Sequence, residues 1–244
     1  MIQAATQDGY PINIPSVFHG YNVIQYLGCG CTCAVFLVED ENTRELFSAK
    51  VMARLDIEKR NIENLMLNEV GVLQAISHPN IIKIVEFFCM KNEYEEEYYI
   101  MIMEYCSNGD LLTYATKHGF ENESEKKKII NGFLCAIKYL HQNGISHGDI
   151  KSENILLDEN YTPKLCDFGF CRTYRIAGEE SKNGTLYYAA PELFQKGQFD
   201  TFKTDIYAIG ITLYSLTELQ FPFRNGDQNF IIQQILAGKL SLRQ

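Results

Sequence analysis

The sequence lacks an excess of basic residues. Its 244 residues include 22 Lys and Arg against 31 Asp and Glu, which gives a formal net charge of −9 at pH 7. A protein that follows nucleic-acid phosphates needs a broad basic surface, so we expect no nucleic-acid partner. The acidic run E-Y-E-E-E, residues 93–97, is typical of a solvated hairpin turn. A docking site for a basic partner is the alternative.

The sequence also lacks a long apolar run and a secretory start. Its longest apolar-rich stretch, residues 206–221, contains Thr212, Ser215, Thr217 and Glu218 and falls short of the roughly 20 apolar residues that span a membrane. The N-terminus has neither the basic start nor the apolar run of a signal peptide. We expect a buried helix at 206–221, no membrane partner, and reduced thiols in the cytoplasm or the nucleus.

The composition is that of a folded protein without internal repeats or low-complexity tracts. Hydrophobic residues make up 46% of the chain and charged residues 22%, which argues against disorder. A chain of this length buries a substantial core, in one large domain or in two lobes.

Residues 21–102 have a strand-rich pattern, whereas residues 1–20 show no period and predict an extension packed loosely on the domain. The five expected strands are residues 21–28, 34–40, 45–52, 81–89 and 98–105. One helix, residues 57–76, interrupts them. It ends before Pro79, because proline disfavours helix at the residue before it.

The polar segment C-S-N-G-D, residues 106–110, predicts a boundary between two lobes. Two helices are expected after it, at residues 111–118 and 126–143. The apolar stripe of the second consists of Ile129, Ile130, Phe133, Ile137 and Leu140. We therefore predict an α+β protein with a small sheet-rich lobe at 21–105 and a larger helical lobe at 106–244. Ligands commonly bind in clefts between domains.

Residues 27–35 form a glycine turn, L-G-C-G-C-T-C-A-V, between two expected strands. Glycines let the backbone approach phosphates closely and donate N–H groups to them. An ordinary hairpin turn explains the same pattern equally well. Because the turn joins two strands and does not open a helix, it argues against a dinucleotide-binding fold.

Lys50 lies in an otherwise apolar strand. There it needs an anion or a carboxylate to offset its desolvation, and Glu69 on the helix of the same lobe is the candidate. The alternative is that both side chains reach solvent. Further along, H-G-D-I-K-S-E-N (147–154) and D-F-G (167–169) gather two carboxylates, an amide and a lysine, which suits phosphoryl transfer with a divalent metal.

These motifs stand in the order found in eukaryotic protein kinases, and the chain resembles the serine/threonine type of that family from about Tyr21 to nearly its end. The resemblance implies a bilobal α+β fold with a small five-stranded antiparallel lobe. It implies ATP and Mg²⁺ as cofactors, with Mn²⁺ as an alternative, and a protein substrate presented as an extended peptide. The expected nucleotide contacts are Leu27, Gly28, Gly30, Val35, Ala49, Lys50, Met103, Glu104, Cys106, Asp110, Leu156 and Asp167.

Within that set, the resemblance gives separate roles. Val35, Ala49 and Leu156 would enclose the adenine, and Lys50, paired with Glu69, would hold the α- and β-phosphates. The gatekeeper, the two backbone contacts to the base and the ribose contact would be Met103, Glu104, Cys106 and Asp110.

The resemblance also implies the catalytic residues, which are Asp149, Lys151, Asn154, Lys50, Glu69 and Thr185. Asp149 would be the base that orients the substrate hydroxyl, and Lys151 would stabilise the γ-phosphoryl group. Asn154 and Asp167 would hold Mg²⁺, and Thr185 would bridge Asp149 and Lys151. Positioning and charge neutralisation carry most of the rate in such a transfer.

Three further positions acquire expected roles from the resemblance. The segment G-T-L-Y-Y-A-A-P-E, residues 184–192, would be the substrate-docking end of an activation segment. Asp205 would fasten the loop that carries Asp149, and a helix N-cap is its alternative role. His147 would be a buried structural residue that stacks with Phe168 and Leu73 in a buried column.

Gly148 is one departure from the family pattern, because it replaces the arginine of the usual H-R-D. That arginine is normally offset by a phosphorylated activation loop. Our hypothesis is that turnover does not require phosphorylation at Thr173, Tyr174 or Ser181.

The C-terminus is a second departure. The family normally continues through further helices and an arginine that pairs with the glutamate of A-P-E, here Glu192. Either the chain is a fragment, or the C-terminal part of the large lobe is absent and the lobe is less stable. An unpaired buried carboxylate at Glu192 would cost on the order of 3–5 kcal/mol. This leaves an alternative function: a pseudokinase or truncated kinase-like domain that binds nucleotide or partners without catalysis. A small-molecule kinase of the same fold is disfavoured by the peptide-docking segment.

A third departure is the alternation of Cys29, Cys31 and Cys33 on the glycine turn, with Cys166 before Asp167. Small packing residues are the favoured interpretation. The alternatives are a redox-sensitive nucleotide pocket and a C-x-C-x-C metal site.

Overall fold

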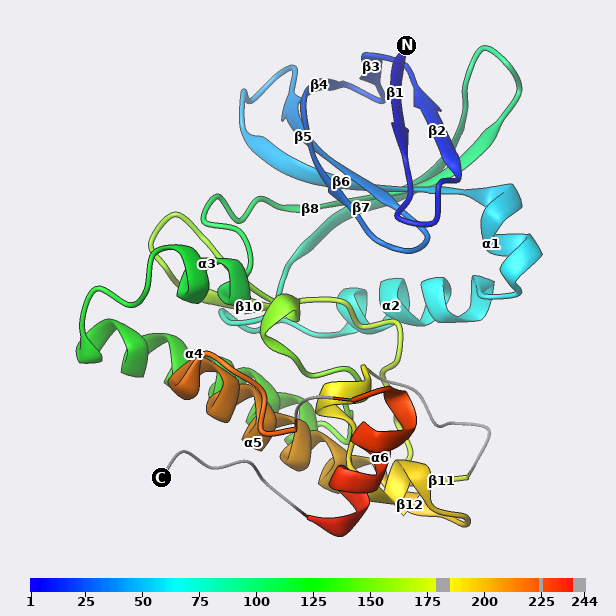
Figure 1. Cartoon of the computed structure of the whole chain (residues 1–244). Coiled ribbons are helices and arrows are strands. Elements are labelled where there is room, and N and C mark those ends of the chain that lie inside the picture. Colours follow the sequence, from blue (N-terminus) through cyan, green and yellow to red (C-terminus); the bar gives the residue numbers. More distant parts are fainter. Residues whose placement is uncertain (179–184, 224–225, 239–244) are drawn as a thin grey trace. The chain divides into compact units, whose positions relative to one another are not determined.

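The computed structural model describes residues 1–178, 185–223 and 226–238, and the chain divides into two compact units (Figure 1). Unit 1 comprises Met1–Ser77 and Ile82–Cys106, and unit 2 comprises His78–Ile81 and Ser107–Gln244. Unit 1 is built on an antiparallel sheet, and most of the regular structure in unit 2 is helical. The predicted α+β class is therefore confirmed.

The sheet of unit 1 has six strands in the order β3-β4-β5-β6-β8-β7. Their bounds are β3 Val17–Phe18, β4 Tyr21–Cys29, β5 Ala34–Asp40, β6 Leu46–Ala53, β7 Ile84–Lys91 and β8 Glu97–Glu104. The five predicted strands are β4 to β8, and the two-residue β3 adds one at the edge. Alternate side chains from β5, β6 and β8 fill one core cluster, which includes Phe36, Val51 and Ile100.

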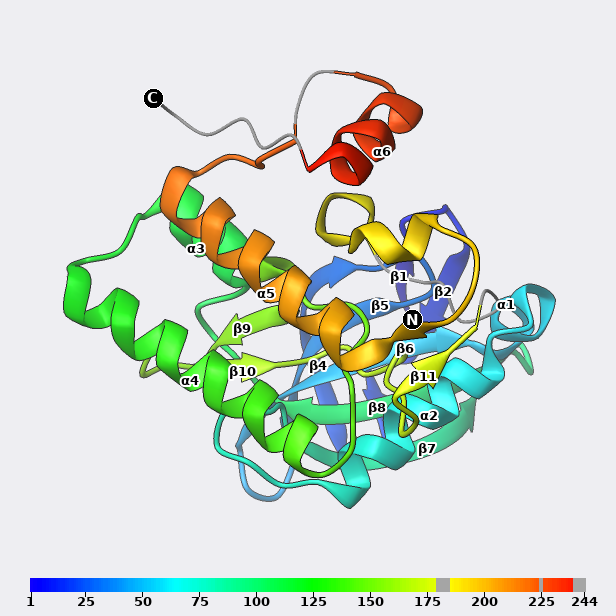
Figure 2. The same cartoon turned by 90° about the horizontal axis from the view of Figure 1, so that it is seen from below.

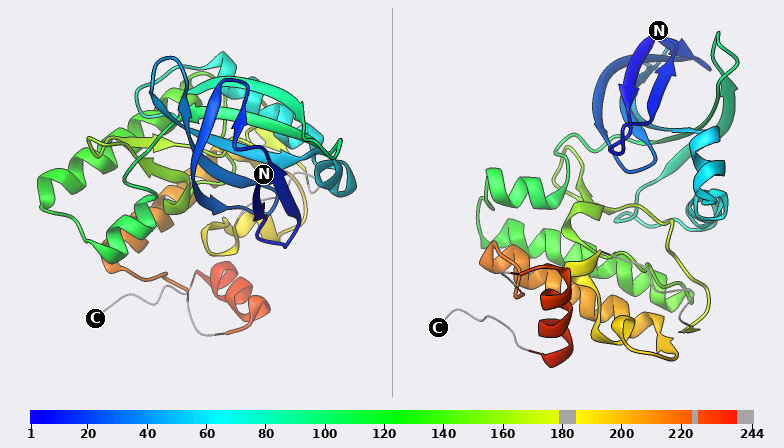
Figure 3. Two further views of the ribbon diagram at one scale, coloured as in Figure 1. Left: turned by 90° about the horizontal axis from the view of Figure 1, so that it is seen from above. Right: turned by 45° about the vertical axis from the view of Figure 1, so that its right-hand side comes forward.

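Residues 1–20 are not packed loosely, so that prediction is wrong. They form a hairpin of β1 (Ile2–Ala5) and β2 (Pro11–Ile14), drawn in dark blue in Figure 3. Ile12 and Ile14 are fully buried in the same cluster as Phe36. Burying two isoleucines stabilises the fold by about 3–6 kcal/mol. The alternation of buried isoleucines at positions 12 and 14 is present in the sequence, but two residues are too few to predict a strand.

The single helix predicted at 57–76 is also wrong, because the structure has two. Helix α1 spans Arg54–Arg60 and helix α2 spans Glu63–Ala75. Asn61 separates them with a left-handed backbone (φ 54°, ψ 43°), a conformation that asparagine tolerates better than most residues. The apolar spacing continues across the break, which is why the pattern concealed it. Ile57 of α1 and Met66 of α2 pack in one cluster.

Unit 2 contains four α-helices, short strands and 3₁₀ turns among its described residues. The helices are α3 Leu111–Lys117, α4 Glu123–Gln142, α5 Thr201–Glu218 and α6 Gln228–Ala237. The strands are β9 Ile155–Leu157, β10 Pro163–Leu165, β11 Ile176–Ala177 and β12 Phe199–Asp200. The 3₁₀ turns are η1 Ser152–Asn154, η3 Leu186–Tyr188 and η4 Pro191–Phe194.

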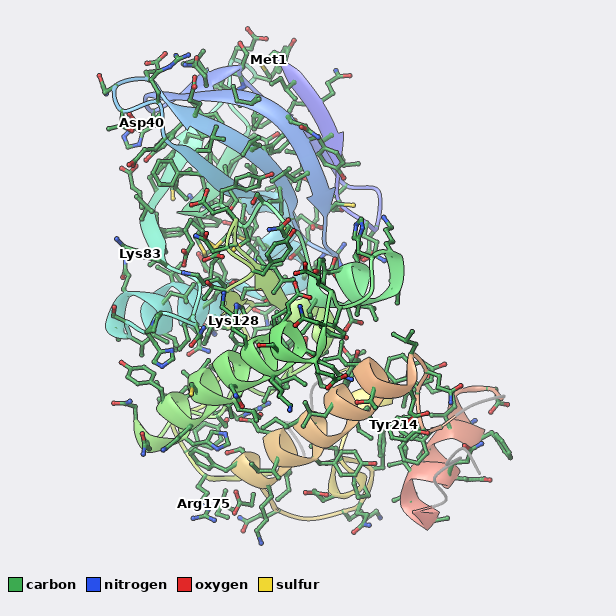
Figure 4. The ribbon with its side chains drawn as sticks, turned by 90° about the vertical axis from the view of Figure 1, so that its left-hand side faces the viewer. Met1, Asp40, Lys83, Lys128, Arg175 and Tyr214 are labelled. Atoms are coloured by element: carbon green, nitrogen blue, oxygen red, sulfur yellow. The ribbon has the colours of Figure 1, made fainter. Side chains whose placement is uncertain are left out.

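Helices α4 and α5 run alongside each other in unit 2 (Figure 2). Helix α4 begins three residues earlier than predicted, because the Asn122 side chain caps it by accepting from the N–H groups of Ser124 and Glu125. The buried stripe of α4 contains Ile129, Phe133, Ile137 and Leu140. Figure 4 shows Lys128 on α4 and Tyr214 on α5, and Lys128 Nζ donates to the carbonyl of Asn160 at 2.9 Å.

The apolar stretch 206–221 falls largely in α5, where Ala208, Ile211 and Leu216 are buried, as a core helix requires. Within the described ranges the structure has no helix with the length and hydrophobicity of a membrane span.

Candidate active site

Lys50 and Glu69 form a buried ion pair in unit 1. Lys50 Nζ lies 2.9 Å and 2.7 Å from the two carboxylate oxygens of Glu69, and the two side chains are only 15% and 6% exposed. Strand β6 carries the lysine, and the buried stripe of α2 carries the glutamate beside Met66 and Leu73. The alternative in which both side chains reach solvent is therefore wrong. The two contacts with Glu69 hold the ammonium group in one orientation.

The glycine turn joins β4 to β5 beside this ion pair in the sheet. Gly28 lies opposite Val35, and Val35 lies opposite Lys50. Residues directly opposite each other on neighbouring strands face the same side of a sheet, so Val35 and Lys50 share a face. The Gly30 N–H donates to the Cys33 carbonyl at 3.0 Å and closes the turn. The strand register thus brings the predicted phosphate loop and the predicted phosphate-binding lysine onto neighbouring strands.

Asp149, Lys151 and Thr185 form a closed triangle in unit 2. Lys151 Nζ lies 2.7 Å from Asp149 Oδ2 and 3.0 Å from Thr185 Oγ1. The Thr185 hydroxyl and N–H donate to Asp149 Oδ1 at 3.0 Å and 3.2 Å. The bridge predicted for Thr185 is therefore present. Both oxygens of a carboxylate that is almost completely buried are held in fixed directions.

The charge on Lys151 is maintained by its surroundings. Burial alone would lower the pKa of Lys151, but the Asp149 carboxylate, with Asp167 and Glu153, raises it above its ordinary value. The lysine is therefore fully charged at neutral pH, as a group that stabilises a migrating phosphoryl must be.

Asn154 and Asp167 flank the β9–β10 hairpin and present oxygen atoms that suit a hard cation. The Asn154 Nδ2 donates to Asp149 O at 2.8 Å and to Asp149 Oδ2 at 3.1 Å, which leaves its Oδ1 as an acceptor. The Cys166 N–H donates to the Asn154 carbonyl at 2.9 Å and so fixes the residue before Asp167. One amide oxygen and one carboxylate fit Mg²⁺ or Mn²⁺, because both ions prefer oxygen ligands. Mg²⁺ also keeps several of its water ligands, so two protein ligands suffice.

Asp167 adopts a left-handed backbone with φ 64°. A non-glycine residue in that region is strained, and such strain clusters at functional sites. Within the described ranges there is no group of three His, Cys, Asp or Glu side chains able to hold a metal by protein ligands alone.

Asp205 fastens the loop that carries Asp149. It is 1% exposed inside α5, and its two oxygens accept the N–H groups of His147 and Gly148 at 2.8 Å and 2.9 Å. Its Oδ2 also lies 2.8 Å from His141 Nε2. The alternative role as a helix N-cap is wrong, because Asp200 caps α5. The predicted tie between this helix and the loop is therefore present.

His147 is a buried structural residue, as predicted. Its ring is fully buried and meets the Phe168 ring edge to face at 5.0 Å between centroids. Its Nε2 lies 3.1 Å from the Cys166 carbonyl. These contacts join the loop before Asp149 to the segment that leads into Asp167.

A family model for the protein kinase domain matches residues 21–243. The chain belongs to this family. It is 32% identical over 224 residues to the serine/threonine-protein kinase SIK1 of Rattus norvegicus, and 31% identical to SIK1 of Mus musculus and to SIK2 of Gallus gallus. Each match covers 91% of this chain, but the chain spans only 27–28% of the length of these relatives.

One residue of the predicted nucleotide set lies on the wrong face of the kinase domain's sheet. Side chains alternate along a strand, so Ala49 and Lys50 point to opposite sides of β6. Ala49 is fully buried in the cluster that contains Phe36, whereas Ser48 shares the face of Lys50. The Ser48 hydroxyl donates to the Glu104 carbonyl at 3.2 Å. Ser48 therefore stands in place of Ala49 in the predicted nucleotide set, and its contact with a nucleotide is a prediction like those of the other members.

The other predicted nucleotide residues of unit 1 lie along β4 and around the end of β8. Leu27 is exposed on β4, and Met103 and Glu104 are the last two residues of β8. The Glu104 N–H donates to the Lys83 carbonyl at 3.0 Å, and Cys106 is buried two residues further on. Their roles toward a nucleotide stay predictions.

In unit 2, Asp110 and Leu156 are paired in an isolated antiparallel bridge. Asp110 caps α3, because its Oδ1 accepts the Thr113 N–H at 2.8 Å. The structure therefore gives Asp110 a local role in addition to the predicted ribose contact, which stays a prediction.

Gly148 is required by the local geometry of the kinase domain. Its φ is +83°, and a Cβ there would lie 2.6 Å from the Phe170 carbonyl oxygen and 2.9 Å from Arg172 Nη1. Arg172 is buried, so its guanidinium occupies space that a side chain at 148 would need. Although position 148 carries no arginine, Arg172 places a guanidinium beside it, so this place is not without a cation.

The hypothesis of phosphorylation-independent turnover stays a prediction. Thr173 and Tyr174 follow the buried Arg172 and are exposed. Ser181, and Gly184 at the start of the peptide-docking segment, lie outside the described residues.

Tyr188 is a positioning residue that the sequence did not reveal. Its hydroxyl donates to Glu153 Oε2 at 2.8 Å and lies 3.0 Å from Ser152 Oγ. Burial and the Glu153 carboxylate raise the pKa of Tyr188, so the hydroxyl remains a donor. These bonds dock η3, and with it Thr185, onto the segment that follows Asp149 and Lys151. Nothing in the pair Y-Y distinguishes the buried Tyr188 from the exposed Tyr187.

The cysteines of the glycine turn divide by burial. Cys29 and Cys31 are exposed, and Cys33 packs with Met52 and Met66 in a buried cluster. The packing interpretation therefore holds for Cys33. Glu192 is only partly buried, so the full cost expected for a buried unpaired carboxylate does not apply to it.

Proposed function

We propose that the chain is an ATP-dependent protein kinase that phosphorylates serine and threonine hydroxyls of protein substrates. The triangle of Asp149, Lys151 and Thr185 carries this proposal, because it presents an oriented carboxylate beside an ammonium group whose pKa is raised by that carboxylate. The relatives are named serine/threonine-protein kinases, which supports the same choice of acceptor.

In the proposed reaction, Asp149 orients the substrate hydroxyl and accepts its proton as the oxygen attacks the γ-phosphorus of ATP. The bond from the γ-phosphorus to the β–γ bridging oxygen breaks, and ADP leaves. Lys151 stabilises the charge on the migrating phosphoryl group, and Lys50, fixed by Glu69, binds the α- and β-phosphates. Asn154 and Asp167 would hold Mg²⁺ or Mn²⁺, which when bound neutralises phosphate charge. Thr185 keeps Asp149 and Lys151 in register, and the segment after it would receive an extended peptide.

The test is transfer of the γ-phosphate to peptide libraries that offer serine, threonine or tyrosine. The wild-type chain, Asp149→Asn and Glu159→Gln are compared, since Glu159 is an exposed carboxylate in the same unit. We expect the wild type and Glu159→Gln to phosphorylate serine and threonine peptides, and Asp149→Asn to be slower by about 10²–10⁴-fold.

Binding of Mg·ATP by all three proteins, measured by the shift in melting temperature, separates the remaining outcomes. A wild type that binds Mg·ATP but transfers no phosphate is the nucleotide-binding pseudokinase, and it overturns the proposal. Preference for tyrosine peptides overturns the assignment of the acceptor.

A further inference from the structure

The tip of the N-terminal hairpin contacts the glycine turn within unit 1. The Gln7 N–H donates to the Gly30 carbonyl at 2.8 Å, and Cys31 Sγ lies 3.6 Å from Gln7 Oε1. Figure 1 shows the β1–β2 connection next to the turn between β4 and β5. Gln7 precedes the region that the kinase family model matches, residues 21–243, so the donor of this contact comes from outside that region.

The hairpin tip is itself rigid. Residues Thr6–Gly9 form a β-turn in which the Gly9 N–H donates to the Thr6 carbonyl at 2.9 Å. Thr6 is buried, and its hydroxyl accepts the Tyr10 N–H at 3.0 Å. Two residues beyond Tyr10, Ile12 is fully buried in the main cluster of unit 1. The backbone N–H of Gln7 is therefore held in a fixed position opposite the Gly30 carbonyl.

The same tip is also joined to helix α1. Asp8 Oδ2 lies 2.9 Å from Arg60 Nη1, and the Arg60 Nε donates to both oxygens of the buried Asp56 at 2.9 Å and 3.0 Å. Arg60 ends α1, and α2 with Glu69 begins three residues later. The hairpin thus links the glycine turn to the helical segment that leads to the partner of Lys50.

A glycine-rich turn has unusual conformational freedom, and a ligand that orders it must overcome that freedom. We propose that Gln7 is a positioning residue for ATP, whose backbone N–H holds the Gly30 carbonyl and so preorganises the glycine turn for the phosphates. This rests on the proposed kinase function. Loss of one such hydrogen bond weakens ATP binding by about two- to tenfold.

Gln7→Pro removes the donor without opposing the turn. Gln7 is the second residue of the turn, neither Gln7 nor Asp8 has a positive φ, and proline is favoured at that position. Gln7→Ala keeps the N–H and removes only the side-chain contact with Cys31. Glu93→Pro is the matched control, since Glu93 is the second residue of the Asn92–Glu95 turn in the β7–β8 hairpin.

We expect Gln7→Pro to raise the KM for ATP by about two- to tenfold, with kcat and the KM for peptide unchanged. Gln7→Ala and Glu93→Pro should match the wild type. A purely structural role would lower the melting temperature without this division between the two KM values. A folded Gln7→Pro protein with the wild-type KM for ATP overturns the inference.

Hydrogen exchange of the wild-type protein without nucleotide tests the contact independently of any variant. We expect the Gln7 amide to exchange slowly, and exchange at the rate of an exposed turn amide overturns the inference even if Gln7→Pro does not fold. A slow Gln7 amide in a protein that neither binds nor uses ATP would instead contradict the proposed function.

Discussion

At the residue scale, Gly148 shows how backbone conformation and available space select one amino acid. Its positive φ is strained for any side chain, and the Phe170 carbonyl blocks the position of a Cβ. Gly144, at the end of α4, has φ +74° but open space around it. A comparison of the two glycines therefore distinguishes the effect of backbone strain, present at both, from that of steric crowding, present only at Gly148.

We predict that Gly148→Ala lowers the free energy of unfolding by about 1–3 kcal/mol and Gly144→Ala by less, because only the first combines strain with a clash. Urea unfolding at equilibrium measures both. Equal losses for the two variants would show that the Phe170 carbonyl moves aside freely.

A second prediction at this scale concerns the residues after Arg172. We predict that Thr173→Ala and Tyr174→Phe each retain turnover, because Arg172, the cation beside Gly148, is buried and already has partners within the fold, so that no phosphate is needed to offset its charge. Peptide phosphorylation by each single variant, with melting temperatures to verify folding, is the measurement. A folded but inactive single variant would contradict the hypothesis.

Residues whose chemistry dictates their partner could be predicted from the sequence. Lys50 in an apolar strand needs a carboxylate, and Glu69 is one on the same lobe. Ser48 could have been predicted from strand alternation, but the match of Ala49-Lys50 to a motif obscured it. The buried positions of Arg172 and Tyr188 could not be predicted from the sequence. Their neighbours come from distant parts of the chain, and either side chain suits an exposed site equally well.

At the scale of elements, one buried carboxylate on α5 holds the catalytic loop. Asp205 accepts two backbone N–H groups and faces His141, whereas Asp200 caps the same helix from a more exposed position. Asparagine keeps only one acceptor oxygen, so it serves as a helix cap but cannot satisfy both amides of the loop.

We therefore predict that Asp205→Asn lowers the free energy of unfolding by about 2–4 kcal/mol and reduces kcat, because the loop with Asp149 loses its anchor. Asp200→Asn should change stability far less. Denaturant unfolding and peptide phosphorylation give the two readouts. Similar losses for both variants would assign the effect to the helix and not to the loop.

The elements were predicted best where the pattern was long. The strands β4 to β8 and the stripe of α4 followed from the spacing of apolar residues. The break at Asn61 and the β1–β2 hairpin could not be predicted from the sequence in the same way, because each depends on only one or two residues. A left-handed asparagine and two alternating isoleucines acquire their meaning only from what they pack against.

At the scale of the whole molecule, the segment His78–Ile81 belongs to unit 2 although it is flanked in sequence by unit 1. The Asn80 side chain donates to the Pro163 carbonyl at 3.1 Å, and the Asn80 carbonyl accepts the Leu165 N–H at 2.9 Å. The division predicted at residues 105 and 106 did not anticipate this segment, since it contains only a helix stop and a few polar residues.

His78 makes the stability of unit 2 depend on pH. Burial lowers the pKa of His78 from its ordinary 6.5, and its Nδ1 accepts the Asn80 N–H at 3.1 Å, which only the neutral ring does. The unfolded chain therefore binds the proton more readily. The stabilisation is complete above about pH 6.5 and is lost as the pH falls below that value.

We predict that the melting temperature of the wild type falls more steeply between pH 7 and pH 5.5 than that of His78→Asn, because asparagine can accept the same N–H without titrating. Thermal unfolding across that range is the measurement. Parallel curves for the two proteins would show that His78 does not titrate in that window.

Residues 78–81, here called the strap, determine where the chain can be divided into fragments that fold. A fragment that begins at Ser107 would lack the hydrogen-bond partners that Asn80 provides to the Leu165 amide and the Pro163 carbonyl, in and beside β10. Gly132 of α4 packs closely against both Pro163 and Asn80, so this contact would be lost as well. We therefore expect the fragment that begins at Ser107 not to be complete on its own. A short peptide that carries the strap, supplied separately, is the missing piece that such a fragment would recruit.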